Sequence, residues 1–395
     1  MSQDWNWMEI QDIYSALYDG PHATPKPSET GPIFLGIKNL TDDGHLDLSE
    51  VRHIDEEEFP RWTKRVLPRA GDIVFTYEAT LNRYAIIPQG FRGCLGRRLA
   101  LIRPDSSKID TRFLFYYFFG KEWRQIVASK INIGSTVDRI PLIDFPGFKI
   151  RIPNLPTQRK IAAILCAYDN LIENNLRRIK ILEEMAQSLY REWFVKFRFP
   201  GHEKVRMVDS PLGMIPAGWR VNTLGEVLEL KYGKALKQEE RRPGLVPVFG
   251  SSGIIGHNNT SLVKGPGIIV GRKGNVGSIF WSNADFYPID TVYFVTSAMP
   301  LRFFFYALKT MNFINNDAAV PGLSRRQAYA LNMVMPPDGL LGSFCGLADC
   351  FEEQASNLRL RCENLRKTRD LLLPRLISGE LDVSELDIKV PEEAA

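Results

Sequence analysis

The chain has 395 residues, of which 44% are hydrophobic and 24% charged, which is ordinary for soluble protein and long enough for two or three domains. It contains no apolar run of about 18 residues, and its start lacks the basic-then-apolar order of a signal peptide, so we expect neither a membrane span nor a leader. The five cysteines form no CxxC pair and do not cluster with the five histidines. We therefore expect free thiols in a reducing cytoplasm and no metal site.

The first globular segment is predicted to mix short strands with a helix. Apolar runs at 33–37, 72–77 and 99–102 are bounded by Gly and Pro, which is typical of strands. A helical pattern covers 112–130.

A long helix is predicted from about residue 157 to Pro200, with Thr157 as its N-cap. Steps of four and three residues define a heptad seam made of Ile161, Leu165, Tyr168, Ile172, Asn175, Ile179, Leu182, Ala186, Leu189 and Trp193. Asn175 is either a tolerated polar residue or one that sets the register of a helix pair. The seam would span roughly 48 Å at 1.5 Å per residue, enough to hold two globular segments apart.

The second half repeats this order, with predicted strands at 267–271 and 291–295, a short helix at 301–312 and a second long helix. The second seam contains Phe344, Phe351, Leu358, Leu365 and Leu372, with a companion row of Ala348, Ala355 and Cys362. Small residues in that row would let the two long helices pack against each other.

The two halves are related by a constant offset of 183 residues. Ile140 aligns with Leu323, Pro153 with Pro336, and the helices follow in the same register. The beginnings of the two segments also correspond, and we align Trp7 with Trp219. Because the offset drifts only inside the globular segments, the pattern indicates a fixed scaffold with two variable heads, which suits a target in two parts.

The expected fold is α+β, with two heads built on bent β-sheets, joined by two long helices that form an antiparallel coiled coil, and an internal pseudo-twofold repeat. The expected domains are a first head at 1–153, a central helix at 154–200, a linker at 201–218, a second head at 219–337, a C-terminal helix at 338–380 and a tail at 381–395.

Charge and loop composition point to nucleic acid. Residues 1–150 carry 19 basic against 20 acidic side chains, a balance of −1, whereas 219–337 carry 13 against 7, a balance of +6. The loop GRKGNVGS at 271–278 combines glycines with two cations, which suits phosphates or guanine edges. A hairpin with solvated charges explains the same pattern equally well.

A second loop pair, GSTVDR at 134–139 and VPGLSRR at 320–326, offers hydroxyls and Arg for phosphate contacts or for capping the next helix. The residues predicted to contact DNA are Thr76, Tyr77, Arg83, Arg97, Arg98, Ser135, Thr136 and Arg139 in the first head, and Ser251, Ser252, Arg272, Lys273, Asn275, Ser324 and Arg325 in the second.

Catalytic motifs are not recognisable. The run MPPD at 335–338 lacks the polar residue and the aromatic of an adenine methyltransferase motif, and DIK at 387–389 matches half of a nuclease motif by chance. No ATP-binding motif is present. The alternatives are a methyltransferase or nuclease with an unfamiliar site, and a coiled-coil adaptor without a DNA role.

Several runs resemble the specificity subunit of type I restriction-modification systems. NLPTQRKIAAIL at 154–165 is similar to the start of that family's first spacer helix, LYREWF at 189–194 to its end, and LRKTRDLLLPRLISGE at 365–380 to the C-terminal signature. GDIVFT at 71–76 and GRKG at 271–274 also look like family runs, whereas PPDGLLG at 336–342 departs from the usual second helix start.

This resemblance implies that each head is a target recognition domain for one half of a split DNA sequence. It implies a non-catalytic chain in the cytoplasm whose partners are double-stranded DNA, two methyltransferase subunits and motor-nuclease subunits. S-adenosylmethionine, ATP and Mg would belong to those partners, and no cofactor to this chain.

Overall fold

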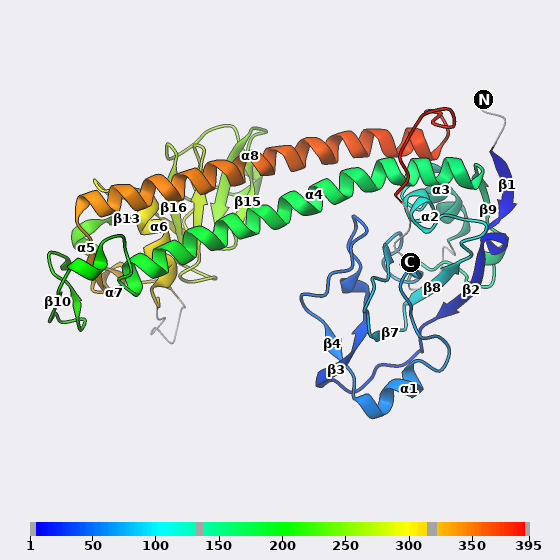
Figure 1. Ribbon diagram of the computed structural model, residues 1–395, viewed down its shortest axis with the longest axis horizontal. Coiled ribbons are helices and arrows are strands. Elements are labelled where there is room, and N and C mark those ends of the chain that lie inside the picture. Colours follow the sequence, from blue (N-terminus) through cyan, green and yellow to red (C-terminus); the bar gives the residue numbers. More distant parts are fainter. Residues whose placement is uncertain (1–4, 132–136, 314–321, 392–395) are drawn as a thin grey trace. The chain divides into compact units, whose positions relative to one another are not determined.

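The computed structural model describes residues 5–131, 137–313 and 322–391. The chain divides into two compact units, Met1–Asn174 with Arg361–Ala395, and Asn175–Leu360. Each unit contains one head and part of both long helices (Figure 1). The expected division into heads, helices and linker remains a prediction.

The first head is built on three sheets, with strand orders β2-β8-β5-β6, β4-β3-β7 and β1-β9. All pairings are antiparallel except β3 with β7. The strands are β1 (Asn6–Glu9), β2 (Tyr14–Asp19), β3 (Ser28–Leu35), β4 (Arg52–His53), β5 (Ile73–Thr76), β6 (Tyr84–Ile86), β7 (Gly93–Leu95), β8 (Leu99–Pro104) and β9 (Lys149–Ile152).

Three short helices accompany these sheets: α1 (Phe59–Trp62), α2 (Thr111–Tyr117) and α3 (Lys121–Lys130). The prediction of one helix over 112–130 was therefore wrong, since the helix breaks after Tyr117. Gly120 lies at the N-cap position of α3 with extended dihedral angles. A Cβ at this position would lie 3.0 Å from the Tyr117 carbonyl oxygen, so the residue between the two helices leaves little room for a side chain.

The second head repeats the first strand by strand. Its sheets have the orders β13-β19-β16-β17, β15-β14-β18 and β12-β20, so adding eleven to each strand number of the first head gives the second. The parallel pair also recurs, as β14 with β18. The strands are β12 (Arg220–Thr223), β13 (Glu229–Tyr232), β14 (Val246–Gly250), β15 (Gly253–Asn258), β16 (Gly267–Gly271), β17 (Ile279–Ser282), β18 (Tyr287–Pro288), β19 (Val292–Thr296) and β20 (Asn332–Met335).

The second unit also contains α5 (Leu224–Val227), α6 (Leu301–Thr310) and α7 (Arg325–Tyr329). Helix α6 ends two residues earlier than predicted. The linker before the head forms a small hairpin of β10 (Met207–Val208) and β11 (Ile215–Pro216). The fold is thus α+β with an internal repeat, as the sequence predicts.

Strand register corrects one part of the sequence alignment. Asn6 pairs with Ile152, and Arg220 pairs with Met335, which lies 183 residues after Ile152. Asn6 therefore corresponds to Arg220, and the partner of Trp219 is Trp5 rather than Trp7. A slip of two residues keeps every side chain on the same face of a strand, so alternation alone could not reveal the error.

The two long helices are α4 (Leu155–Tyr190) and α8 (Asp338–Ile377), whose starts are 183 residues apart. Every predicted seam position of α4 is buried or half-buried, including Asn175 at 9% exposure. Ala348, Ala355 and Cys362 on α8 are buried as well. The periodic pattern therefore predicted the packed face of both helices.

The helices run antiparallel within each unit. In the first unit, Asp169 pairs with Arg369 and the Ile172 carbonyl lies 3.8 Å from the Cys362 sulfur. In the second, Glu183 pairs with Arg359. As the residue number rises on α4, it falls on α8.

Both ends of α4 differ from the prediction. Thr157 is not the N-cap, because the Asn154 side-chain oxygen accepts a hydrogen bond from the Thr157 backbone N–H at 3.0 Å. Asn154 thus caps the helix, and Pro156 falls in the first turn, where a missing N–H costs no hydrogen bond. The α-helix ends at Tyr190, and a single π-helical turn, Arg191–Val195, follows instead of a helix to Pro200.

Candidate nucleic-acid interface

The predicted glycine-rich loop of the second head is a hairpin between β16 and β17. The Gly271 N–H donates to the Ser278 carbonyl at 2.7 Å, and the strands pair antiparallel on either side. Gly274 and Gly277 both have φ of +76°, a conformation that favours glycine. The hairpin interpretation is correct for the backbone, but its cations do not simply extend into water.

The structure joins this hairpin to the second predicted loop. The Leu323 N–H donates to the Arg272 carbonyl at 2.8 Å, and Lys273 forms an isolated antiparallel bridge with Gly322. Loops about fifty residues apart in sequence therefore form one wall of a shallow depression of about 430 Å³. It is lined by Tyr232, Arg272, Lys273, Tyr293, Gly322, Leu323, Ser324, Arg325 and Arg326.

Two guanidinium groups lie against tyrosine rings in this depression. The Arg325 Cζ atom is 4.4 Å from the Tyr232 ring centroid, and the Arg272 Cζ atom is 5.2 Å from the same centroid and 5.8 Å from that of Tyr293. Arg272 also donates from Nε and Nη2 to the Asp290 carbonyl, at 3.1 and 2.7 Å. Cation–π contacts of this kind hold a guanidinium plane in place while leaving its edge free.

The tyrosines are residues that sequence reasoning did not nominate. Tyr232 is 49% exposed, whereas Tyr293 is buried and donates its hydroxyl hydrogen to the Leu323 carbonyl at 2.9 Å. Burial, together with the Tyr232 hydroxyl, raises the pKa of Tyr293 to about 12, so it stays a donor at neutral pH. The run Lys231-Tyr232-Gly233 in the sequence gives no sign of this role.

Four basic side chains gather in this depression. Among the described residues, no carboxylate lies within ion-pair distance of the cations Arg272, Lys273, Arg325 and Arg326. Lys273 and Arg326 are exposed. The second head therefore presents four positive charges at one place, which is the electrostatic footprint expected of a nucleic-acid contact.

The other predicted residues of this head lie around the hairpin. Ser251 accepts a hydrogen bond from the Ser278 hydroxyl through its carbonyl at 2.7 Å, and Ser252 follows it in the β14–β15 turn. Asn275 is exposed in the hairpin itself. Ser324 occupies the N-cap position of α7, but its hydroxyl accepts no capping hydrogen bond.

The first head has the same loop arrangement with different side chains. The Ile140 N–H donates to the Tyr77 carbonyl at 2.8 Å, as the Leu323 N–H does to the Arg272 carbonyl. The backbones of Glu78 and Arg139 form an isolated antiparallel β-bridge. Here, however, one of the cations is paired, because Arg98 Nε lies 3.4 Å from a Glu78 carboxylate oxygen. The same side chain has a buried Nε atom without a hydrogen bond.

The remaining predicted cations of the first head differ in availability. Arg83 donates to Asp42 at 2.7 Å and to the Leu40 carbonyl at 3.2 Å. Arg97 and Arg139 are exposed. Both therefore remain candidates for DNA contact.

Two predicted contacts need correction. Thr76 and Tyr77 are both fully buried, the Thr76 hydroxyl accepting from the Arg83 N–H and the Tyr77 hydroxyl donating to the Arg97 carbonyl. Their hydroxyls hold the loop together and offer DNA no surface. Ser135 and Thr136 lie outside the described residues.

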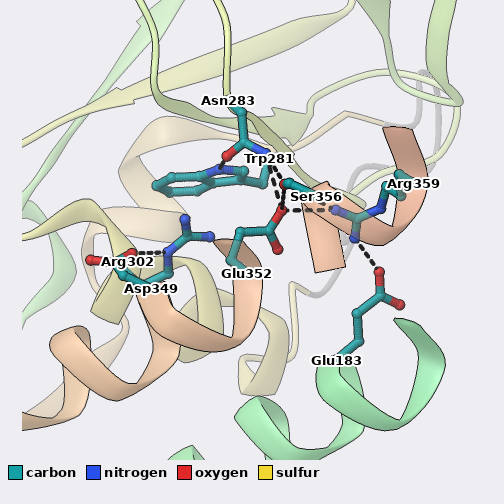
Figure 2. A network of polar contacts seen from close by, with 8 residues as sticks. All are labelled: Glu183, Trp281, Asn283, Arg302, Asp349, Glu352, Ser356 and Arg359. Atoms are coloured by element: carbon teal, nitrogen blue, oxygen red, sulfur yellow. Dashed lines mark hydrogen bonds and ion pairs between the residues drawn. The ribbon is translucent and has the colours of Figure 1, made fainter. Parts of the chain in front are cut away.

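A polar network fastens the second head to the long helices within its unit (Figure 2). Arg302 of α6 is buried, ion-paired with Asp349 at 2.7 Å and placed 3.7 Å from the Trp281 ring centroid. Beside it, Glu352 of α8 accepts from Asn283 at 3.0 Å and from Arg359 at 2.9 Å. Burial opposes ionisation of Glu352, but the Asn283 hydrogen bond and the Arg359 charge outweigh it and lower its pKa.

The first unit has a corresponding network at the equivalent place on α4. Asp169, 183 residues before Glu352, accepts from the Tyr116 hydroxyl and from Arg369, each at 2.6 Å. Burial raises the pKa of Tyr116, as do the neighbouring Cys166 and Asp169. A helix carboxylate bonded to its own head and to an arginine of α8 is thus a repeated feature; Asp169 reaches the opposite helix directly, and Glu352 reaches it through Arg359 and Glu183.

The described residues contain no group of three potential metal ligands, and the five cysteines are free thiols. Within the same residues, no helix is both long and apolar enough to cross a bilayer.

The sequence matches the family of the type I restriction modification DNA specificity domain over residues 4–184 and 216–326. The chain belongs to this family. The match covers the first head, most of α4 and the second head up to α7. The expectation that the chain is not itself the enzyme agrees with relatives that are named specificity subunits.

Individual relatives extend the comparison along the chain. The MjaIX type I restriction enzyme specificity subunit of Methanocaldococcus jannaschii is 26% identical, over 97% of this chain and 95% of its own length. A putative type I specificity subunit of Mycoplasma pneumoniae is 30% identical, but over only 41% of this chain and 40% of its own. The crystal structure of the type I S subunit from M. genitalium superposes with a TM-score of 0.59 at 18% identity, covering 94% of this chain and 96% of the other, so the fold is shared.

Proposed function

We propose that this specificity subunit recognises a DNA sequence in two separated halves, one read by each head. The observation that carries the proposal is the exact strand-by-strand repetition of the two heads, each with a loop pair at the same topological position. Two similar heads with different loop side chains suit two half-sites of different sequence. The four cations that line the depression of the second head supply positive charge for the phosphate backbone.

The long helices would hold partner subunits. Apolar side chains that the helix pair leaves exposed could be covered by apolar partner surfaces: Leu171 and Leu371 in the first unit, and Leu176, Ile181, Met185, Leu347 and Leu360 in the second. The partners in this proposal are two methyltransferase subunits and the motor-nuclease subunits. S-adenosylmethionine, ATP and Mg would be bound by those partners and not by this chain.

The test is sequencing of methylated adenines in the host genome, with and without this gene. We expect one bipartite motif to disappear with the gene and to return when it is restored. Purified chain mixed with S-adenosylmethionine, without partners, should neither bind nor consume it. Turnover by the isolated chain would instead favour a stand-alone methyltransferase, and an unchanged methylome would contradict the proposal.

A further inference from the structure

We infer that Arg325 reads a guanine in the half-site of the second head, and that Tyr232 is the positioning residue that orients its guanidinium. The inference rests on the proposed function and adds to it a residue, a base and a physical means of holding the two in register. Arg272 and Arg325 differ in the N–H donors that their contacts with the protein leave available.

Arg272 has already used its side-on edge. Its Nε and one N–H of Nη2 donate to the Asp290 carbonyl, which leaves three N–H groups, one on Nη2 and two on Nη1. The end-on pair that remains can meet a phosphate or a base, but the Nε–Nη2 edge cannot.

Arg325 keeps the side-on edge that Arg272 has used. Its one hydrogen bond to protein runs from Nη1 to the Leu230 carbonyl at 3.4 Å, within the part of the chain that the structure describes. Nε and Nη2 therefore remain together as a free edge, which is the geometry that binds a guanine edge or a phosphate through two parallel hydrogen bonds.

The contact with Tyr232 favours a guanine over a phosphate as the ligand of Arg325. A phosphate can be neutralised by a flexible side chain, and the exposed Lys273 and Arg326 are available for that role. Base reading requires a fixed plane, and the ring 4.4 Å from Cζ restrains the Arg325 guanidinium without using its edge. Tyr232 is itself held by β13, where it pairs with Tyr293 of β19. The restraint therefore derives from the sheet and not from a loop.

The experiment compares methylomes of hosts that express the wild-type chain or one variant with its natural partner subunits. The half-site of the second head is the half that changes when residues 219–335 are exchanged for those of a relative. We expect that half to contain a G·C pair at which Arg325→Lys, which keeps the charge but loses the fork, reduces discrimination by about 5- to 150-fold. Tyr232→Leu should relax the same position, and Tyr232→Phe, which keeps the ring, should behave as wild type.

Arg220→Lys is the matched control, because it makes the same exchange at an exposed arginine of the second head outside the depression and should leave the motif unchanged. Thermal unfolding of each variant separates misfolding from altered reading. The inference is overturned if the half-site has no G·C pair, if Arg325→Lys methylates the wild-type motif with equal stringency, or if Arg325→Ala weakens binding equally for every sequence. Absence of any bipartite motif in the wild-type host would instead refute the proposed function, and this inference with it.

Discussion

Removing two cations from the second head should flatten the salt dependence of DNA binding. Arg272 and Lys273 lie in the depression without a carboxylate partner among the described residues, so their charge is free to displace counterions from DNA. Each phosphate contact contributes about −0.9 to the slope of log affinity against log salt. The Arg272→Ala, Lys273→Ala double variant should therefore have a slope less negative by roughly 1.8, which between about 50 and 200 mM salt is a difference of about 12-fold.

The assay is fluorescence anisotropy of the assembled complex on a duplex with its methylation motif, titrated at several salt concentrations. The matched control is Arg61→Ala with Arg92→Ala, which removes the same net charge from exposed side chains already paired with Glu58 and Glu56. We expect the control to keep the wild-type slope within experimental error. Equal slopes for all three proteins would refute the reasoning and reduce the loop to a plain hairpin, and equal flattening in the control would mean that net charge alone matters.

Three further changes test other parts of the molecule. Inserting seven residues after Glu184 should lengthen the gap between the half-sites in the methylome and leave both half-sites unchanged; altered half-sites would contradict the separation of heads and helices. Exchanging residues 219–335 for a relative's head should replace one half-site only, with methyltransferase co-purification retained, since loss of assembly in a folded exchange would place docking on the head. Tyr84→Phe should lower the free energy of unfolding by about 1–3 kcal/mol, because the buried Trp123 indole N–H donates to the Tyr84 hydroxyl at 2.8 Å in the wild-type chain. Denaturant unfolding should show this loss when the variant is compared with Tyr18→Phe, a control at a half-exposed tyrosine. Equal stability of the two variants would mean that another acceptor replaces the Tyr84 hydroxyl.

The long helices and the repeat are properties that the sequence determines by itself. A heptad seam consists of residues three and four apart in the sequence. The positions that this period marks, from Ile161 to Trp193, are buried or half-buried in the structure. The offset of 183 survives in the starts of α4 and α8 and in the strands β9 and β20. Where the pattern allowed two answers, as with Trp5 and Trp7, the sequence alone could not choose, because both lie on one face of a strand.

The candidate interface depended on the tertiary structure. Tyr232, Arg272 and Arg325 meet because β19 pairs with both β13 and β16, and because a loop from beyond α6 bonds to the end of β16. In the first head, the corresponding pairing of β8 with β2 and β5 accompanies the burial of Thr76 and Tyr77, which the polar sequence pattern placed at the surface. Local periodicity encodes which face of an element is apolar, but the partner of each strand is set by contacts between distant residues, and these decide which loop side chains share one surface.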